Sequence, residues 1–270
     1  MDHINGLVLS AGSVPGGPRP VYAMNQTLKG IETVFSDRLW PNLAAWDGQE
    51  RPDAALILTE LHGDTNEYRS IMDGISVRTM PLSHGLCGSH ADAPTYESTA
   101  FFIRHDPSSQ EFLFFGDVEP DSVARHPRLR SVWAAAAPKV PHALSTLFIE
   151  CSFPRGRPDG VLYGHLSPEH LAAELSSLAE EVVSHRRNAK DLADDTRARK
   201  KQKRNPVLPE DLHGALDGLR VFIIHCKEDL QLQYDRPMHD IIADQVRSLV
   251  DEKELGAEIH AAAQGMHIYV

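Results

Sequence analysis

Short apolar runs alternate with segments of helical spacing along the chain, and this alternation predicts an α/β protein. The apolar runs are four to seven residues long and are bounded by turn residues, which is typical of buried strands. They predict strands at residues 54–58, 75–78, 98–104, 111–115, 144–149 and 220–225. Apolar residues three and four apart predict helices over 25–35 and 238–253, and a third that Ser167 opens as N-cap, followed by Pro168.

Two segments carry no such pattern. The Gly/Pro cluster at 12–20 predicts a loop. Residues 186–206 contain the basic run 197–204 and almost no large apolar side chain, which predicts a disordered insertion. A solvated loop is favoured over a nuclear-import patch. The rest shows no internal repeat and no second core, so we expect a single domain over residues 1–270 with this insertion.

Composition narrows the class of protein. The 270 residues carry a formal net charge of -11, which argues against a general nucleic-acid binder but not against a small phosphate ester bound at a metal. No apolar run approaches the roughly 20 residues of a membrane helix, and the first residues do not resemble a signal peptide. Three cysteines without CxxC spacing predict buried, reduced thiols. We therefore expect a cytoplasmic protein, with nuclear import through the basic loop as the alternative.

Titratable side chains recur where the predicted strands end. His84, Asp117, Glu150 and His225 each follow such a strand, and Asp2-His3 precedes the first apolar segment. Sites in α/β proteins form where strands finish. Histidine and aspartate suit Zn²⁺ or Mn²⁺, and a two-metal hydrolase needs imidazoles for each ion and an aspartate to bridge them. The sequence therefore predicts a metal centre.

Six short motifs, in order, make this prediction more specific. "DHINGLVLS" resembles the tail of the HxHxDH motif of metallo-β-lactamase-fold hydrolases, in the form seen in class II cyclic-nucleotide phosphodiesterases. "PLSHG", "FFGDVEPD", "IECSF", "YGHLSP" and "IIHCKE" follow in the order of that family. Any one of these strings alone would be weak. Together they span nearly the whole chain except the basic insertion.

The resemblance implies a fold and a reaction. The fold is a metallo-β-lactamase-type αββα sandwich, with its first sheet incomplete in this chain. The reaction is hydrolysis of 3′,5′-cyclic nucleotides, cyclic AMP first among them, to 5′-monophosphates. Two zinc ions are expected, with Mn²⁺ or Mg²⁺ as alternatives, and the partner is a small-molecule cyclic nucleotide, without nucleic acid or membrane.

The resemblance also assigns roles by position. It places Asp2 and His3 on the second metal together with His225, and counts Asp2 among the catalytic residues as well. It makes His84 a ligand of the first metal and Asp117 the bridging aspartate. His165 is then expected near the scissile phosphate, where an acid must protonate the departing 3′-oxygen, and Glu150 is expected to orient it.

One part of the family pattern is missing. The two histidines of H-x-H would stand just before Met1, so we predict that Met1 is an internal methionine and that the natural protein extends upstream. If the chain is complete as given, the first metal keeps only His84 and Asp117. An incomplete first sheet would leave an unpaired edge, which favours aggregation or pairing with another chain, and hence a homo-oligomer.

Plainer interpretations stay open beside these roles. His84 and Asp117 could be turn residues, and His225 a core histidine. His90 competes for the role of His84, whereas His62 is expected in a loop and His267 in a last strand. The competing functions are a tRNA-end nuclease of the same fold and a metal-poor, non-catalytic remnant.

Overall fold

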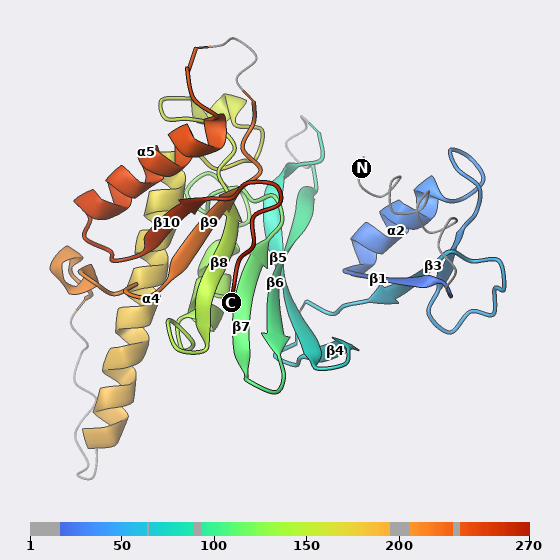
Figure 1. Cartoon of the computed structure of the whole chain (residues 1–270), viewed down its shortest axis with the longest axis horizontal. Helices are drawn as coiled ribbons and strands as arrows, with labels where there is room; N and C mark the ends of the chain where they lie inside the picture. Colours follow the sequence, from blue (N-terminus) through green and yellow to red (C-terminus); the bar gives the residue numbers. More distant parts are fainter. Residues whose placement is uncertain (1–16, 64, 89–92, 195–205, 229–232) are drawn as a thin grey trace.

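The computed structural model describes two β-sheets, with one described helix against the smaller and three against the larger (Figure 1). The described residues are 17–63, 65–88, 93–194, 206–228 and 233–270, without the side chains of 191–194. The smaller sheet is parallel and has the order β1-β3-β2. Its elements are β1 (Arg19–Ala23), α2 (Asn25–Val34), β2 (Ala44–Trp46) and β3 (Leu56–Glu60).

The larger sheet has seven strands in the order β10-β9-β8-β7-β6-β5-β4. Strands β4 to β7 pair antiparallel, and β7 to β10 pair parallel. The carboxyl ends of the parallel strands β7, β8 and β9 therefore meet at one edge. The strands are β4 (Arg69–Met72), β5 (Ile75–Leu86), β6 (Thr95–His105), β7 (Gln110–Phe115), β8 (Leu144–Glu150), β9 (Arg220–Ile224) and β10 (Glu258–Ala261).

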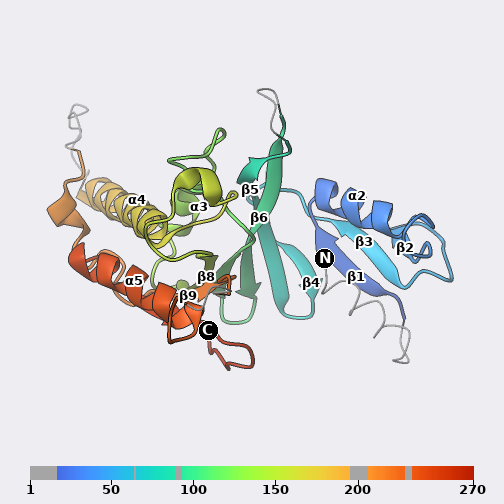
Figure 2. The ribbon, with the colours of Figure 1, turned by 90° about the horizontal axis from the view of Figure 1, so that it is seen from above.

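Three helices lie beside the parallel half of the large sheet, while the small sheet lies on its other side (Figures 1 and 2). They are α3 (Leu129–Ala136), α4 (Pro168–Asp194) and α5 (Met238–Glu252). Two short 3₁₀ turns, η1 (Asp159–Val161) and η2 (Pro209–Leu212), complete the described helical structure. Fully buried aromatic side chains such as Phe102, Phe115 and Trp133 fill the space beneath these helices, and each contributes about 2–3 kcal/mol of hydrophobic stabilisation.

A second buried cluster lies in the small sheet, where Leu28 and Phe35 pack against Leu56 and Leu58. This finding corrects the expectation of no second core. The cluster was missed because its strands are short and its apolar residues are few. A single domain over residues 1–270 stays a prediction.

Every predicted helix and strand is present except the last strand expected around His267, although several have different bounds. The basic insertion predicted for residues 186–206 is wrong in its first part, because α4 continues through Asp194. Residues 195–205 lie outside the described part of the chain. Strands β1, β2, β4 and β10 and helix α3 were not predicted, because each is only three to eight residues long. No helix in the described part of the chain is long and apolar enough to cross a membrane.

Candidate metal centre

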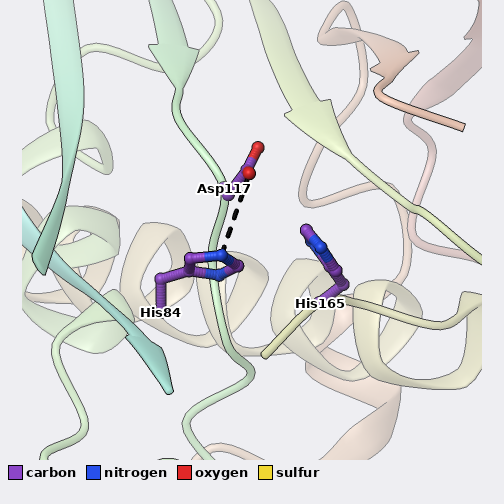
Figure 3. A group of neighbouring side chains, drawn as sticks. All are labelled: His84, Asp117 and His165. Carbon is purple, nitrogen blue, oxygen red and sulfur yellow. Dashed lines mark ion pairs between the residues drawn. The ribbon is translucent and has the colours of Figure 1, made fainter. Parts of the chain in front are cut away.

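Five of the predicted site residues lie together at the strand edge of the large sheet. His84 belongs to β5, Asp117 follows β7, Glu150 ends β8, His165 precedes α4 and His225 follows β9. Figure 3 shows His84 and His165 on either side of the Asp117 carboxylate. Side chains up to 141 positions apart in sequence thus share one site, as the strand ends predict.

Among the other histidines and acids of the sequence analysis, those in the described part of the chain, His62 and His267, are not members of this group. Asp2, His3 and the competing His90 lie outside the described residues. His62 is an exposed histidine that faces Glu60 at 3.5 Å, in keeping with a loop position. His267 is not in a strand, contrary to the prediction, because the last described strand ends at Ala261.

His84 lies inside a strand and not at its end, which corrects the expected position. Strand β5 continues to Leu86, but its pairing with β6 shifts by one residue between Ser83 and Leu86. Such a bulge turns a side chain away from the regular alternation. Gly85 has φ +75°, a left-handed conformation that glycine adopts without strain, and the bulge aims His84 at Asp117.

The carboxylate of Asp117 faces a different histidine with each oxygen. Its Oδ2 lies 3.8 Å from Nε2 of His84, and its Oδ1 lies 3.4 Å from Nε2 of His225. Gly116, the residue before Asp117, lies close against Ser98 and Thr99 and so allows the Asp117 backbone to take this position. A Cβ on Gly116 would lie 2.5 Å from Oγ of Ser98, so only glycine fits there without displacing that side chain.

Hydrogen bonds determine which nitrogen of two histidines carries the proton. Nδ1 of His84 donates to the carbonyl of Gly164 at 2.8 Å, and Nδ1 of His165 donates to Oε1 of Glu150 at 2.8 Å. A neutral imidazole has one N–H, so Nε2 of each ring presents a lone pair to the site. An acceptor behind a ligating histidine is the usual second partner at a metal centre.

Glu150 is the buried hub beneath the site. Besides His165, its carboxylate accepts from the backbone N–H of Val118 at 2.9 Å, from Oγ of Ser152 at 2.8 Å and from the backbone N–H of Leu166 at 3.4 Å. Its side chain is 1% exposed. With these four partners and no access to solvent, Glu150 can position His165 but cannot itself touch a substrate.

The electrostatics favour a neutral imidazole at His225 and protonated thiols at Cys151 and Cys226. Burial lowers the pKa of His225, although the Asp117 charge raises it in part. Burial also raises the pKa of Cys226 to about 12 and holds that of Cys151 well above its usual range. Neither thiol is therefore prepared to act as a thiolate ligand. The third thiol, Cys87, is exposed, which corrects the expectation that all three are buried.

These residues fit a metal ion. The ligand atoms of His84, Asp117 and His165 all lie within 4.8 Å of one another. Lone pairs on the nitrogens face a carboxylate at distances that a cation between them would bridge, and nitrogen and carboxylate ligands suit zinc. His165 has the geometry of a ligand as well as of an acid, an ambiguity that the sequence did not reveal.

Three contributing residues carried no role in the sequence analysis. Ser152 also donates to the backbone oxygen of His225 at 3.0 Å, Gly164 supports His84, and the Tyr96 ring lies edge-on to His84 at 5.9 Å. Ser152 and Gly164 stand inside the motifs "IECSF" and "YGHLSP", so their position beside assigned residues was the available signal. For Tyr96 we find none.

The chain is similar to several curated cyclic-nucleotide phosphodiesterases. It is 33% identical over 188 residues to a 3′,5′-cyclic-nucleotide phosphodiesterase of Schizosaccharomyces pombe. The aligned region covers 68% of this chain and 50% of the relative. It is 30% identical over 191 residues to a 3′,5′-cyclic-nucleotide phosphodiesterase of Aliivibrio fischeri. That aligned region covers 67% of this chain and 51% of the relative. The chain thus spans about half the length of these curated relatives.

The fold is similar to that of several solved structures. Unliganded yeast PDE1 matches 98% of this chain and 64% of its own, with a TM-score of 0.73 and 25% sequence identity. Zinc-bound PqqB from Methylobacterium extorquens matches 96% of this chain and 68% of its own, with a TM-score of 0.50 at 12% identity. The predicted α/β class of the metallo-β-lactamase type is confirmed.

The family model described as cAMP phosphodiesterases class-II matches residues 1–265, which includes all the motifs on which the predicted resemblance rests. This match spans both sheets and every described residue of the candidate centre. The chain therefore belongs to the class-II cAMP phosphodiesterase family.

Proposed function

We propose that this chain hydrolyses 3′,5′-cyclic nucleotides, cyclic AMP above all, to 5′-monophosphates at the centre around Asp117. Its family and the names of its relatives support the reaction. The observation that carries the proposal is the Asp117 carboxylate, whose two oxygens face His84 and His225 at 3.8 Å and 3.4 Å. This is the arrangement that a bridging ligand between two cations needs.

In this proposal the chain holds two metal ions. His84 and Asp117 would bind the first, and Asp117, His225, Asp2 and His3 the second. Zinc is the proposed metal, with Mn²⁺ or Mg²⁺ as alternatives, because imidazole and carboxylate suit all of these to different degrees. Bound metal supplies Lewis-acid stabilisation of the phosphoryl oxygens and lowers the pKa of a bound water.

The described side chains then divide the remaining work. In its imidazolium form His165 carries a second proton, on Nε2, and gives it to the departing 3′-oxygen, which cannot leave as an alkoxide at low cost. The buried carboxylate of Glu150 fixes the ring through Nδ1 and stabilises the imidazolium before the transfer. His165 is therefore the proposed catalytic acid, and Glu150 its positioning residue.

The remaining proposals concern the binding partner, the cellular location and the oligomeric state. A net charge of -11 supports a small nucleotide as partner and not a nucleic acid. We further propose a cytoplasmic location. Association into a homo-oligomer stays a prediction.

The test combines metal content with product analysis. The 270-residue chain, loaded with zinc, is incubated with cyclic AMP, and the products are separated by anion exchange. We expect 5′-AMP. Asp117→Asn should lose both metal and activity, whereas His165→Asn should keep the metal and lose about 100-fold or more in rate. His62→Asn, at an exposed histidine outside the centre, is the matched control.

Three outcomes would contradict the proposal. A metal-loaded chain that leaves cyclic AMP intact would favour the non-catalytic alternative, and cleavage of precursor tRNA instead would favour the nuclease. Loss of metal in His165→Asn would make His165 a ligand and remove the proposed acid.

A further inference from the structure

The motif "IIHCKE" places a lysine directly against a proposed metal ligand. Nζ of Lys227 lies 2.7 Å from Nε2 of His225. An ammonium group has donors only, so the histidine nitrogen must be the acceptor. The lone pair that receives this hydrogen bond is the one that a metal ion at His225 would need. Lysine and metal therefore exclude each other at this atom.

The backbone holds Lys227 over the site. His225 has φ +59°, a left-handed conformation that is uncommon for a residue other than glycine and is often found at functional sites. The backbone N–H of Lys227 donates to the carbonyl of Ser152 at 2.9 Å, and the Ser152 hydroxyl donates to the carbonyl of His225. These backbone contacts hold Lys227 beside His225, which itself faces Asp117 at 3.4 Å.

No carboxylate in the described part of the chain lies within 4 Å of the Lys227 ammonium to neutralise it there. A metal bound to His225 would take the only acceptor that the described contacts give this ammonium, and would also repel it. The ammonium would then need a new anionic partner within its reach. A phosphate held at the same centre meets this need, because lysine binds phosphate oxygens as a flexible point charge.

We propose that Lys227 binds the phosphate group of the nucleotide in the metal-loaded protein, and that its ammonium competes with a metal ion for Nε2 of His225. The proposal rests on the proposed function for the identity of the phosphate ester. It gives Lys227 a catalytic contact with the substrate that the sequence analysis did not assign.

Removal of the ammonium then has two effects of opposite sign. Lys227→Met keeps the apolar stem but removes the competitor and its charge, so zinc should bind more tightly than in the wild type. The same variant should bind phosphate about tenfold or more weakly, because a charge-assisted contact is lost. A lysine that only stabilised the turn would weaken both when replaced.

The experiment measures both affinities on the 270-residue chain. Zinc affinity is measured by competition with a chromophoric chelator, and inorganic phosphate binding by calorimetry with zinc at saturation. Lys227→Arg keeps the positive charge and should restore most of the phosphate affinity. Lys253→Met, at an exposed lysine after α5, is the matched control and should change neither value.

The proposal is overturned if Lys227→Met binds phosphate as tightly as the wild type, or if it binds zinc more weakly. It is also overturned if the wild-type chain binds neither zinc nor phosphate. Because the probes are zinc and inorganic phosphate, the result does not depend on hydrolysis of cyclic AMP. A chain that hydrolyses nothing but loses phosphate affinity in Lys227→Met would contradict the proposed function and support this inference.

Discussion

His165 and Glu150 form a buried pair in which Nδ1 of the imidazole lies 2.8 Å from Oε1 of the carboxylate. The two residues come from different elements, one before α4 and one at the end of β8, and the pair joins the helical layer to the sheet. Because three further donors hold the carboxylate, the orientation of the ring is a property of the fold. Substitutions at Glu150 should therefore change the orientation of the His165 ring and, through it, the rate of hydrolysis.

Replacing Glu150 with glutamine should reduce the rate of hydrolysis and leave metal content unchanged. The amide would place an N–H₂ group against donors such as the backbone N–H of Leu166, which loses a hydrogen bond and disturbs the ring of His165. We expect a loss of about 100-fold or more in kcat and a destabilisation of about 1–3 kcal/mol. Zinc content, steady-state kinetics and urea unfolding measure the three quantities. Glu210→Gln, at an exposed glutamate in η2, serves as control.

If Glu150→Gln instead lost zinc in proportion to its activity, His165 would be acting as a metal ligand. That outcome would contradict the assignment of His165 as the acid.

Gly164 should not tolerate alanine, because the loop that carries it passes directly against His84. Its φ is +79°, and a Cβ would lie 3.0 Å from the backbone carbon of His84 and 3.1 Å from its oxygen. Gly164→Ala should therefore move the carbonyl that orients the His84 ring, weaken zinc binding, and destabilise the fold by about 1–2 kcal/mol. Chelator competition and thermal unfolding measure these effects. Gly160→Ala, in the neighbouring turn η1, is the control, since nothing lies within 4 Å of a Cβ built there. Equal effects in the two variants would refute the argument.

The strand-end residues singled out in the sequence lie close together in the structure, although their roles stay predictions. His84, Asp117 and His225 stand beside apolar runs that become β5, β7 and β9, so strand order alone brings them to one edge. Whether Asp2 and His3 complete the centre stays a prediction, because both lie outside the described residues.

What could not be predicted depends on packing across the chain. The bulge that turns His84 needs the register of β5 against β6, and the contact of Gly164 with His84 joins positions 80 residues apart. The length of α4 was misjudged because the basic composition after residue 186 was read as disorder, although arginine and lysine are good helix formers. The local sequence pattern determines neither a strand register nor a contact between residues far apart in the chain.

A buried ion pair lies at the opposite end of β7 from Asp117. Nζ of Lys139 lies 2.7 Å from Oε2 of Glu111, and the hydroxyl of Tyr68 donates to the same oxygen at 2.6 Å. Lys139→Met would leave the Glu111 charge buried without its cation, so we expect a destabilisation of about 3 kcal/mol. Lys139→Met combined with Glu111→Gln removes both charges and should recover much of this loss. Urea unfolding of the wild type, the two single variants and the double variant gives the coupling free energy. Additive losses of stability would argue against the pair. Unchanged zinc content would confirm that the effect is distant from the metal centre.

Glu174 should make stability depend on pH. Its side chain is buried on α4, where Nε1 of Trp133 and the backbone N–H of Asp121 donate to its two oxygens at 2.9 Å each. Burial nevertheless raises the pKa of Glu174 above the unfolded value of 4.5. The folded state therefore holds the proton to a higher pH than the unfolded state does, and the stability contributed by this group is complete below pH 4.5 and is lost as the pH rises through the folded pKa. Glu174→Gln does not titrate, so its free energy of unfolding relative to the wild type should increase over that window.

Urea unfolding of both metal-free proteins at several pH values from about 4 to 7 measures this difference, and other titrating groups cancel in the comparison. Glu210→Gln, exposed in η2, should show a difference from the wild type that does not change with pH. A difference for Glu174→Gln that stays constant or decreases with rising pH would mean that the two hydrogen bonds outweigh burial and that the folded pKa is not raised. Because the hydrogen bonds of Glu174 go to Trp133 and Asp121 and not to residues of the metal centre, zinc content should be the same in all three proteins.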